Sequence, residues 1–107
     1  MSGDAEKGRE IEHTMKIATD VLDFAKRTGR IPEQLTEVYP DGFRSGIFRD
    51  YWGGTVEFVP DAYGFKLQAY GTRQKGVGVK PRVEAYFNVK GPDGKCLDRW
   101  EFYPRRK

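Results

Sequence analysis

The chain has little of the chemistry on which enzymes and disulfide-rich secreted proteins depend. Its 107 residues include one cysteine and one histidine. A lone cysteine excludes an internal disulfide, and we interpret Cys96 as a small strand residue, because free cysteines usually pack as small hydrophobic groups. No apolar run approaches the roughly 18 residues that cross a bilayer, so we expect no anchor helix within residues 1–107. A charged-then-apolar leader is also missing.

Candidates for catalysis are few and scattered. His13 is near Glu10 and Glu12 on an expected helix. The pattern places no oriented partner or pocket beside it, as general acid–base catalysis requires. The other nucleophiles have no His-centred arrangement around them either: Ser2, Ser45 and Cys96. We therefore predict a protein that is not an enzyme.

The charge is modest in sum and uneven along the chain. The net charge is +3, but residues 1–65 carry −4 and residues 66–107 carry +7. An electrically polar molecule favours head-to-tail contact with copies of itself, or contact with an acidic partner. The plain alternative to such a contact is that the uneven charge reflects only solvated faces of different charge.

An amphipathic helix is predicted over about residues 4–28. Its apolar positions recur at spacings of four, three, four and three, which is typical of one buried helix face: Ile11, Met15, Ala18, Leu22 and Ala25. Asp4 is a plausible N-cap, and Gly29 can end the helix in the left-handed conformation. Pro32 suits the first turn of a short second helix over about 32–38. An irregular loop over 39–50 follows.

The second half predicts an antiparallel sheet between residues 54 and 103. Apolar and polar residues alternate over 55–58, 65–70, 82–89 and 95–103, separated by turns at 60–64 and 91–94. Trp100 and Phe102 are expected to point inward, and Asp98 breaks their alternation, which indicates a bulge or a strand edge. Residues 71–81 read as a loop without the Gly-Lys-Ser/Thr of a phosphate-binding loop.

These elements predict one α+β domain over residues 1–107. The long N-terminal helix supplies an apolar stripe, and the four-stranded antiparallel sheet supplies one apolar face. We expect the helix to pack across that face.

The order of these features resembles a known family. The pattern is Phe24-x4-Gly29-Arg30-x-Pro32, then Asp50-x-Trp52-Gly53 opening a strand, then Tyr70-Gly71 closing the next. It is similar to the soluble head of type IV pilin-like proteins, with the closest resemblance to the major pseudopilin of type II secretion systems. The resemblance covers about residues 10–76. We expect these residues to act in folding: Gly29 and Pro32 at the helix exit, and Trp52 with Gly53 and Gly54 at the helix–sheet junction.

Two positions depart from the family pattern. Tyr51 stands where the family usually has proline. The family's calcium loop, rich in aspartate, corresponds here to Thr72-Arg73-Gln74-Lys75-Gly76-Val77-Gly78, which has no carboxylate. Calcium needs several hard oxygen ligands, so we predict no metal and no cofactor. Asp93 and Asp98 are only the weakest candidates for metal ligands elsewhere in the chain. We expect the hairpin 82–103 to brace the sheet in place of a metal.

The resemblance implies a function in assembly. Such proteins carry an apolar N-terminal helix, methylated at its N-terminus, that anchors a periplasmic head to the inner membrane. They assemble with copies of themselves or other pilin-like subunits into filaments of a secretion system, and they contact its machinery. On this hypothesis the assembly interface includes six residues: Glu6, Arg9, Glu10, His13, Arg105 and Arg106.

A small basic binding module for nucleic acid is the alternative. Its basis is the +7 second half together with aromatic residues expected on the solvent side of the sheet: Tyr63, Tyr70 and Tyr86. The alternative includes a pilin-like subunit that serves DNA uptake. An apolar run encoded ahead of residue 1 would favour the stalked subunit, and salt-dependent binding to single-stranded DNA would favour the module or the DNA-uptake subunit.

Overall fold

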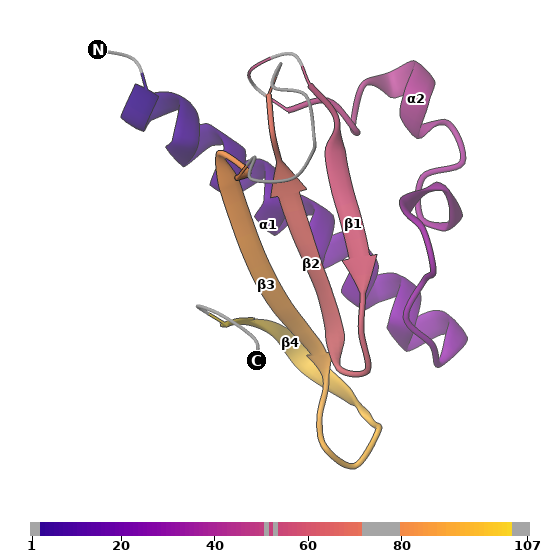
Figure 1. The fold of residues 1–107 in the computed structure, drawn as a ribbon. Coiled ribbons are helices and arrows are strands. Elements are labelled where there is room, and N and C mark those ends of the chain that lie inside the picture. The colour runs from indigo at the N-terminus through magenta and orange to yellow at the C-terminus, as the bar shows by residue number, and fades with distance from the viewer. Residues whose placement is uncertain (1–2, 51, 53, 72–79, 104–107) are drawn as a thin grey trace.

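The fold is a long helix, a connecting segment with two short helices, and four strands (Figure 1). The computed structural model describes residues 3–50, 52, 54–71 and 80–103. The elements follow one another in this order: α1 (Gly3–Thr28), the 3₁₀ helix η1 (Leu35–Glu37), α2 (Gly42–Ser45), β1 (Val56–Pro60), β2 (Gly64–Ala69), β3 (Val83–Lys90) and β4 (Cys96–Tyr103). None of the helices in these residues is both long enough and apolar enough to span a membrane.

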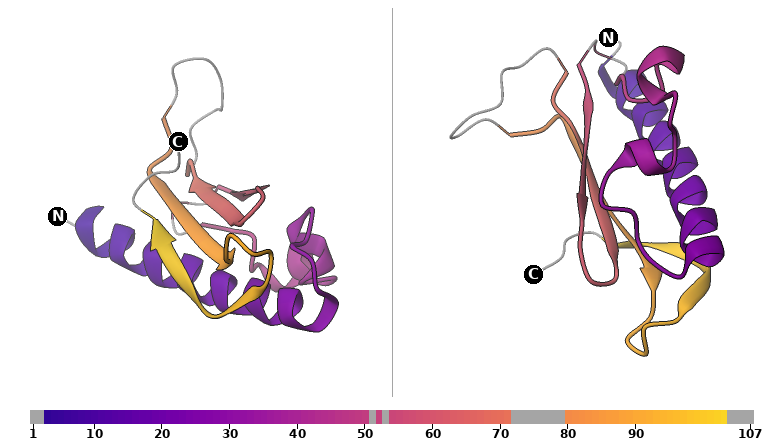
Figure 2. Two further views of the ribbon diagram at one scale, coloured as in Figure 1. Left: turned by 90° about the horizontal axis from the view of Figure 1, so that it is seen from below. Right: turned by 90° about the vertical axis from the view of Figure 1, so that its right-hand side faces the viewer.

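The four strands form one antiparallel sheet in the order β1-β2-β3-β4. Seen along the sheet, α1 and the connecting segment 30–48 lie on the same side of it (Figure 2). Helix α1 lies closest to β3 and β4, and the connecting segment covers the inner side of β1. The predicted α+β arrangement, a long helix packed on a four-stranded antiparallel sheet, is confirmed.

The end of α1 is formed as its sequence predicts. Gly29 has a φ of 78°, in the left-handed region that glycine adopts without strain. Its N–H donates to the carbonyl oxygen of Ala25 at 2.8 Å, which completes the helix with a left-handed cap. Lys90 from β3 donates to the Gly29 carbonyl oxygen at 2.9 Å, so the cap is also bonded to the sheet.

The core forms where the apolar stripe of α1 meets the apolar face of the sheet. Ile17 and Val21 are fully buried against residues of the central strands, among them Phe65, Leu67 and Phe87. One phenylalanine per strand builds a row of rings across the whole sheet. The centroid distances are 5.2 Å for Phe58–Phe65, 5.1 Å for Phe65–Phe87 and 4.9 Å for Phe87–Phe102.

The first turns of the predicted stripe are not covered. Ile11 is 40% exposed and Met15 is 36% exposed. Phe102, which we expected to point inward, is 47% exposed at the outer strand, although its ring stays on the inner side of the sheet beside Phe87. The physical reason is the same for all three residues, since the described chain provides no further element beyond β4 to pack on them.

The connecting segment differs from its prediction. The helix expected over 32–38 is only the 3₁₀ turn Leu35–Glu37, and Pro32 is a buried residue ahead of it rather than its first residue. The loop expected over 39–50 contains the short helix Gly42–Ser45. Phe48 is buried and fixes this segment to the core.

The strand boundaries agree with prediction to within one or two residues, with two details of interest. Pro60 lies in β1 rather than in the turn, at the sheet edge where proline is tolerated. The pairing of β3 with β4 shifts register between Asn88 and Lys90, and β4 holds the extra residues between Cys96 and Glu101. The irregularity predicted around Asp98 is therefore confirmed.

Candidate functional site at the Asp50 clasp

The carboxylate of Asp50 holds the entry of β1 to the exit of β2. One carboxylate oxygen, Oδ1, accepts hydrogen bonds from the backbone N–H of Trp52 at 2.9 Å and of Gly54 at 2.8 Å. The other, Oδ2, accepts the N–H of Gly71 at 2.9 Å. Asp50 itself is only 6% exposed. We call this arrangement the Asp50 clasp, because one side chain joins segments 21 residues apart in sequence.

Glycine is required on both sides of the clasp. A Cβ atom on Gly54 would lie 1.8 Å from the carbonyl oxygen of Gly71, which is backbone and cannot move aside cheaply. Gly71 has a φ of 70°, and a Cβ there would lie 2.9 Å from Cβ of Trp52. The expected role of Gly54 in a close approach is confirmed, whereas Gly53 lies outside the described residues.

Trp52 is half-buried at this junction, and the side chain of Arg82 lies over its indole ring. The guanidinium carbon of Arg82 lies 5.3 Å from the centroid of the indole ring, which is a cation–π contact. Arg82 is the residue just before β3, and its N–H donates to Ala69 at 2.7 Å. Sequence reasoning missed Arg82, because nothing in the strand pattern links it to a tryptophan thirty positions earlier.

His13 reaches the same region from α1. His13 Nε2 lies 2.8 Å from the carbonyl oxygen of Ile47, and burial lowers the pKa of the imidazole below its ordinary value while the nearby charge of Asp50 raises it. His13 and Asp50 also line a hollow of about 210 Å³ together with Gly46 and Arg49. Helix α1 is thereby tied to the entry of the sheet.

The predicted assembly residues on α1 do not share one exposed face. Glu10 is fully buried, so its side chain is not available to a neighbouring subunit, and we withdraw it from the predicted interface. His13 is half-buried, and Arg9 is exposed. The side chain of Glu6, and Arg105 and Arg106 entirely, lie outside the described part of the chain. Glu10 lies one helical turn before the buried Thr14, but in the sequence it is a charged residue at the margin of the apolar stripe, so its burial could not be predicted.

The signature residues of the first half gather at the opposite end of α1. Phe24 is buried, and the guanidinium carbon of Arg30 lies 5.2 Å from its ring centroid. Pro32 is buried beside the helix end, where Gly29 turns the chain. Arg30 also forms an ion pair with Glu37 of η1. The signature thus divides into two clusters: the helix exit and the Asp50 clasp.

The chemistry of the clasp is that of a structural brace. Both oxygens of Asp50 accept backbone N–H groups, which is how a buried carboxylate is stabilised in a fold. Within the described residues, no three side chains of the His, Cys, Asp and Glu types gather as a metal would require. The stretch 72–78, which we expected to lack calcium ligands, lies outside those residues. Cys96 is half-buried, and its Sγ contacts the carbonyl oxygen of Ala25 at 3.4 Å.

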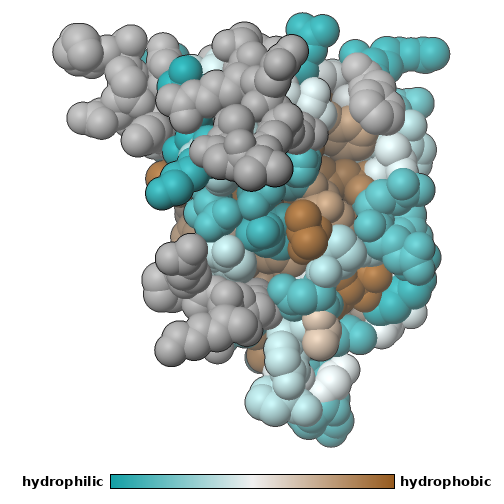
Figure 3. Space-filling model, in the orientation of Figure 1, coloured by the Kyte–Doolittle hydropathy of each residue, from teal (hydrophilic) through white to brown (hydrophobic). Residues whose placement is uncertain are grey.

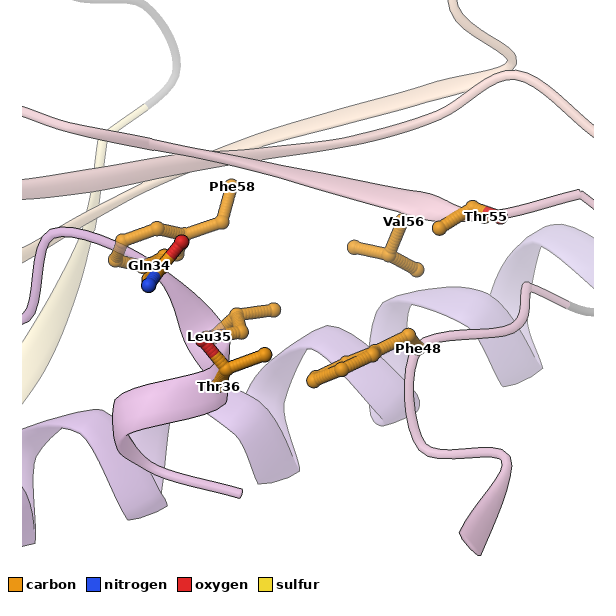
Figure 4. Close-up of a pocket in the computed structure, with 7 residues that line it drawn as sticks. All are labelled: Gln34, Leu35, Thr36, Phe48, Thr55, Val56 and Phe58. Carbon is orange, nitrogen blue, oxygen red and sulfur yellow. The ribbon is translucent and has the colours of Figure 1, made fainter. Parts of the chain in front are cut away.

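A small apolar pocket lies beside the outer edge of β1 (Figure 4). Leu35 and Phe48 of the connecting segment face Val56 and Phe58 of β1 across it. Its volume is about 210 Å³, below the roughly 300–1,000 Å³ of typical small-molecule sites. In the space-filling view, apolar surface lies between β1 and the connecting segment, while the rest of the sheet's open face is mainly hydrophilic (Figure 3).

The open face carries the tyrosines of the nucleic-acid hypothesis among charges of both signs. Lys66 Nζ lies 5.8 Å from the ring centroid of Tyr86, whose hydroxyl group donates to Glu84. Tyr70 donates to Gln68, and Tyr63, in the turn between β1 and β2, is 44% exposed. Glu84 lies beside the Lys66–Tyr86 contact, so this face carries charges of both signs among the described residues.

Comparison with known proteins gives no match. No family model, curated protein or solved structure matches the chain.

Proposed function

We propose that this protein is a non-enzymatic, pilin-like structural subunit that assembles into a filament of a bacterial secretion or pilus machine. On this proposal it is the periplasmic head of a protein anchored in the inner membrane. Its partners are copies of itself or other pilin-like subunits, and the machinery that assembles them. One observation supports the proposal most: the described residues of the pseudopilin-like pattern form two compact clusters along the same long helix, one at its C-terminal end and one beside His13 near its middle.

The first cluster fixes where α1 ends, and the second ties its N-terminal half to the sheet. The Asp50 clasp closes the sheet beside His13, and Arg30 covers Phe24 at the helix exit. A helix held at two points along its length behaves as a rigid rod on its head domain. That is what a subunit needs if its N-terminal end is to meet neighbours at a fixed angle.

The uncovered start of α1 supports the same function. Ile11 and Met15 present apolar surface on a helix whose remaining stripe is buried. Arg9 lies exposed on the turn before them. Subunits that pack through this part of the helix would bury the two apolar side chains and gain the free energy of transfer from water.

Cross-linking in cells that make the protein tests the proposal. In a Cys96→Ser background, Arg9→Cys treated with a bis-maleimide should give a ladder of multimers, whereas Asp93→Cys at the exposed tip of the β3–β4 hairpin should give none. Monomers only from both variants would contradict the proposal. Salt-dependent binding of single-stranded DNA without any multimers would favour the alternative, a small nucleic-acid-binding module.

A further inference from the structure

The two edges of the sheet are complementary to each other, and we propose that the β1 edge of one copy of this chain pairs with the β4 edge of the next. The paired copies would form one continuous antiparallel sheet. This inference deepens the proposed function and rests on it for the filament, since it names the contact between neighbouring heads.

Strand parity allows the pairing. The sheet has four strands, each antiparallel to its neighbour, so β1 and β4 run in opposite directions. A second copy placed in the same orientation beside the first therefore presents its β4 antiparallel to β1. Its helix layer also lies on the same side of the extended sheet.

The backbone groups at the two edges are in matching phase. The Val56 N–H donates to Phe48 at 2.7 Å and so points away from β2. Because strand residues alternate in direction, the N–H and C=O groups of Phe58 point outward as well. Phe48 and Arg49 of the connecting segment already pair with the outer side of β1 at Val56 and Thr55. The edge open to a second copy therefore begins at Phe58, whose outward N–H and C=O groups have no further hydrogen bond among the described residues.

The same reasoning applies at the β4 edge. Val89 donates toward β2, to Tyr63 at 2.8 Å, so the neighbouring residue Asn88 points toward β4. The pair Asn88–Glu101 then carries the β3–β4 bonds, and the N–H and C=O groups of Phe102 point outward. Phe58 of one copy and Phe102 of the next can thus exchange two hydrogen bonds with their side chains on the same face.

The side chains at this pairing complete an existing pattern. Phe58 and Phe102 are the two ends of the row of rings that crosses the sheet. Phe102 is 47% exposed, and the pocket of about 210 Å³ beside Phe58 opens on the inner side of β1. In the paired register the ring of Phe102 from the neighbouring copy lies over this pocket, next to Phe58. The row then continues from one copy into the next.

Charge favours a contact between the two edges, because it brings the negative first half of one chain against the positive second half of the next. Because each strand is rotated by roughly 20–25° from the last, four strands turn each copy by about 80–100°. The assembly is therefore an open helix built of heterologous contacts.

Disulfide trapping tests the register. In the Cys96→Ser background, Val59→Cys and Glu101→Cys are expected to lie opposite each other across the contact, with Cα atoms about 4.5 Å apart, within disulfide reach. The control mixes Glu57→Cys with Glu101→Cys, which are offset by two residues, or about 7 Å along the strand. Within one chain, positions 59 and 101 are on opposite edges of the sheet and cannot meet.

Mixing the purified single-cysteine proteins at high concentration under mild oxidation should give about tenfold more 59–101 dimer than 57–101 dimer, because only the first pair lies within bonding distance. Equal yields, or no dimer from either mixture, would overturn the inference. If the Arg9→Cys multimers form in cells while the 59–101 dimer does not, the edge pairing is wrong and the proposed function stands. A 59–101 dimer without those multimers would support the pairing and contradict the filament.

Discussion

Replacing Asp50 should destabilise the fold more than any exposed carboxylate does. In Asp50→Ala, three backbone N–H groups lose their acceptor, those of Trp52, Gly54 and Gly71. Leaving a buried donor without a partner costs about 1–3 kcal/mol. The Gly71 N–H lies in a buried contact and bears this cost in full, whereas water can partly replace the two half-buried contacts. We expect a loss of about 3–5 kcal/mol in the free energy of unfolding.

Asp50→Asn should cost less, because the amide keeps one oxygen acceptor. Its NH₂ group would face an N–H donor on the other side, so we expect a loss of about 2 kcal/mol. Urea unfolding followed by tryptophan fluorescence measures both variants, with an unchanged dependence on denaturant as the sign of an intact fold. Asp41→Ala is the matched control, since Asp41 is exposed and its side chain caps no helix. A cost for Asp50→Ala below about 1 kcal/mol, or equal to that of the control, would refute the clasp as a structural brace.

Two further predictions concern the same junction. Gly54→Ala should destabilise the protein by about 3 kcal/mol or more, because its Cβ meets the Gly71 carbonyl oxygen. The control is Gly8→Ala on α1, where nothing lies within 4 Å of the added Cβ, and it should stabilise the protein by up to about 1 kcal/mol. Thermal unfolding distinguishes the two variants. Burial lowers the pKa of His13 in the folded protein below 6.5, so the unfolded chain binds the proton more tightly. The His13 contribution to stability is therefore complete above about pH 6.5 and is lost as the pH falls through the folded-state pKa. The free energy of unfolding between about pH 5 and pH 8 should show this slope, and His13→Gln, which keeps a donor for the Ile47 carbonyl, should remove it; an unchanged slope would contradict the assignment.

The helix and the strands could be predicted because they repeat with a period. The stripe that includes Ala18 and Leu22 defines α1, and Gly29 marks its end through a local property of glycine. The alternation along β3 gives Ala85 and Phe87 the same buried face. Such patterns depend only on neighbours in sequence.

The contacts between distant segments could not be predicted in this way. That Asp50 would bond Gly71 depends on a close approach of two backbones, and the sequence marks it only by glycines that many turns also use. Glu10 is fully buried although its charge is typical of an exposed residue. The exposure of Ile11 and Met15 depends on where β4 ends relative to α1, which no local period encodes.

The C-terminal hairpin is hydrogen-bonded to the end of α1. Lys26 donates to the Asp98 carbonyl oxygen at 3.0 Å, Cys96 contacts Ala25, and Lys90 reaches Gly29. These partners are separated by 72, 71 and 61 residues. During synthesis α1 leaves the ribosome before β3 and β4, so its apolar stripe stays open to water until these strands have followed. Such long-range closure slows folding and prolongs the time during which the apolar stripe is exposed.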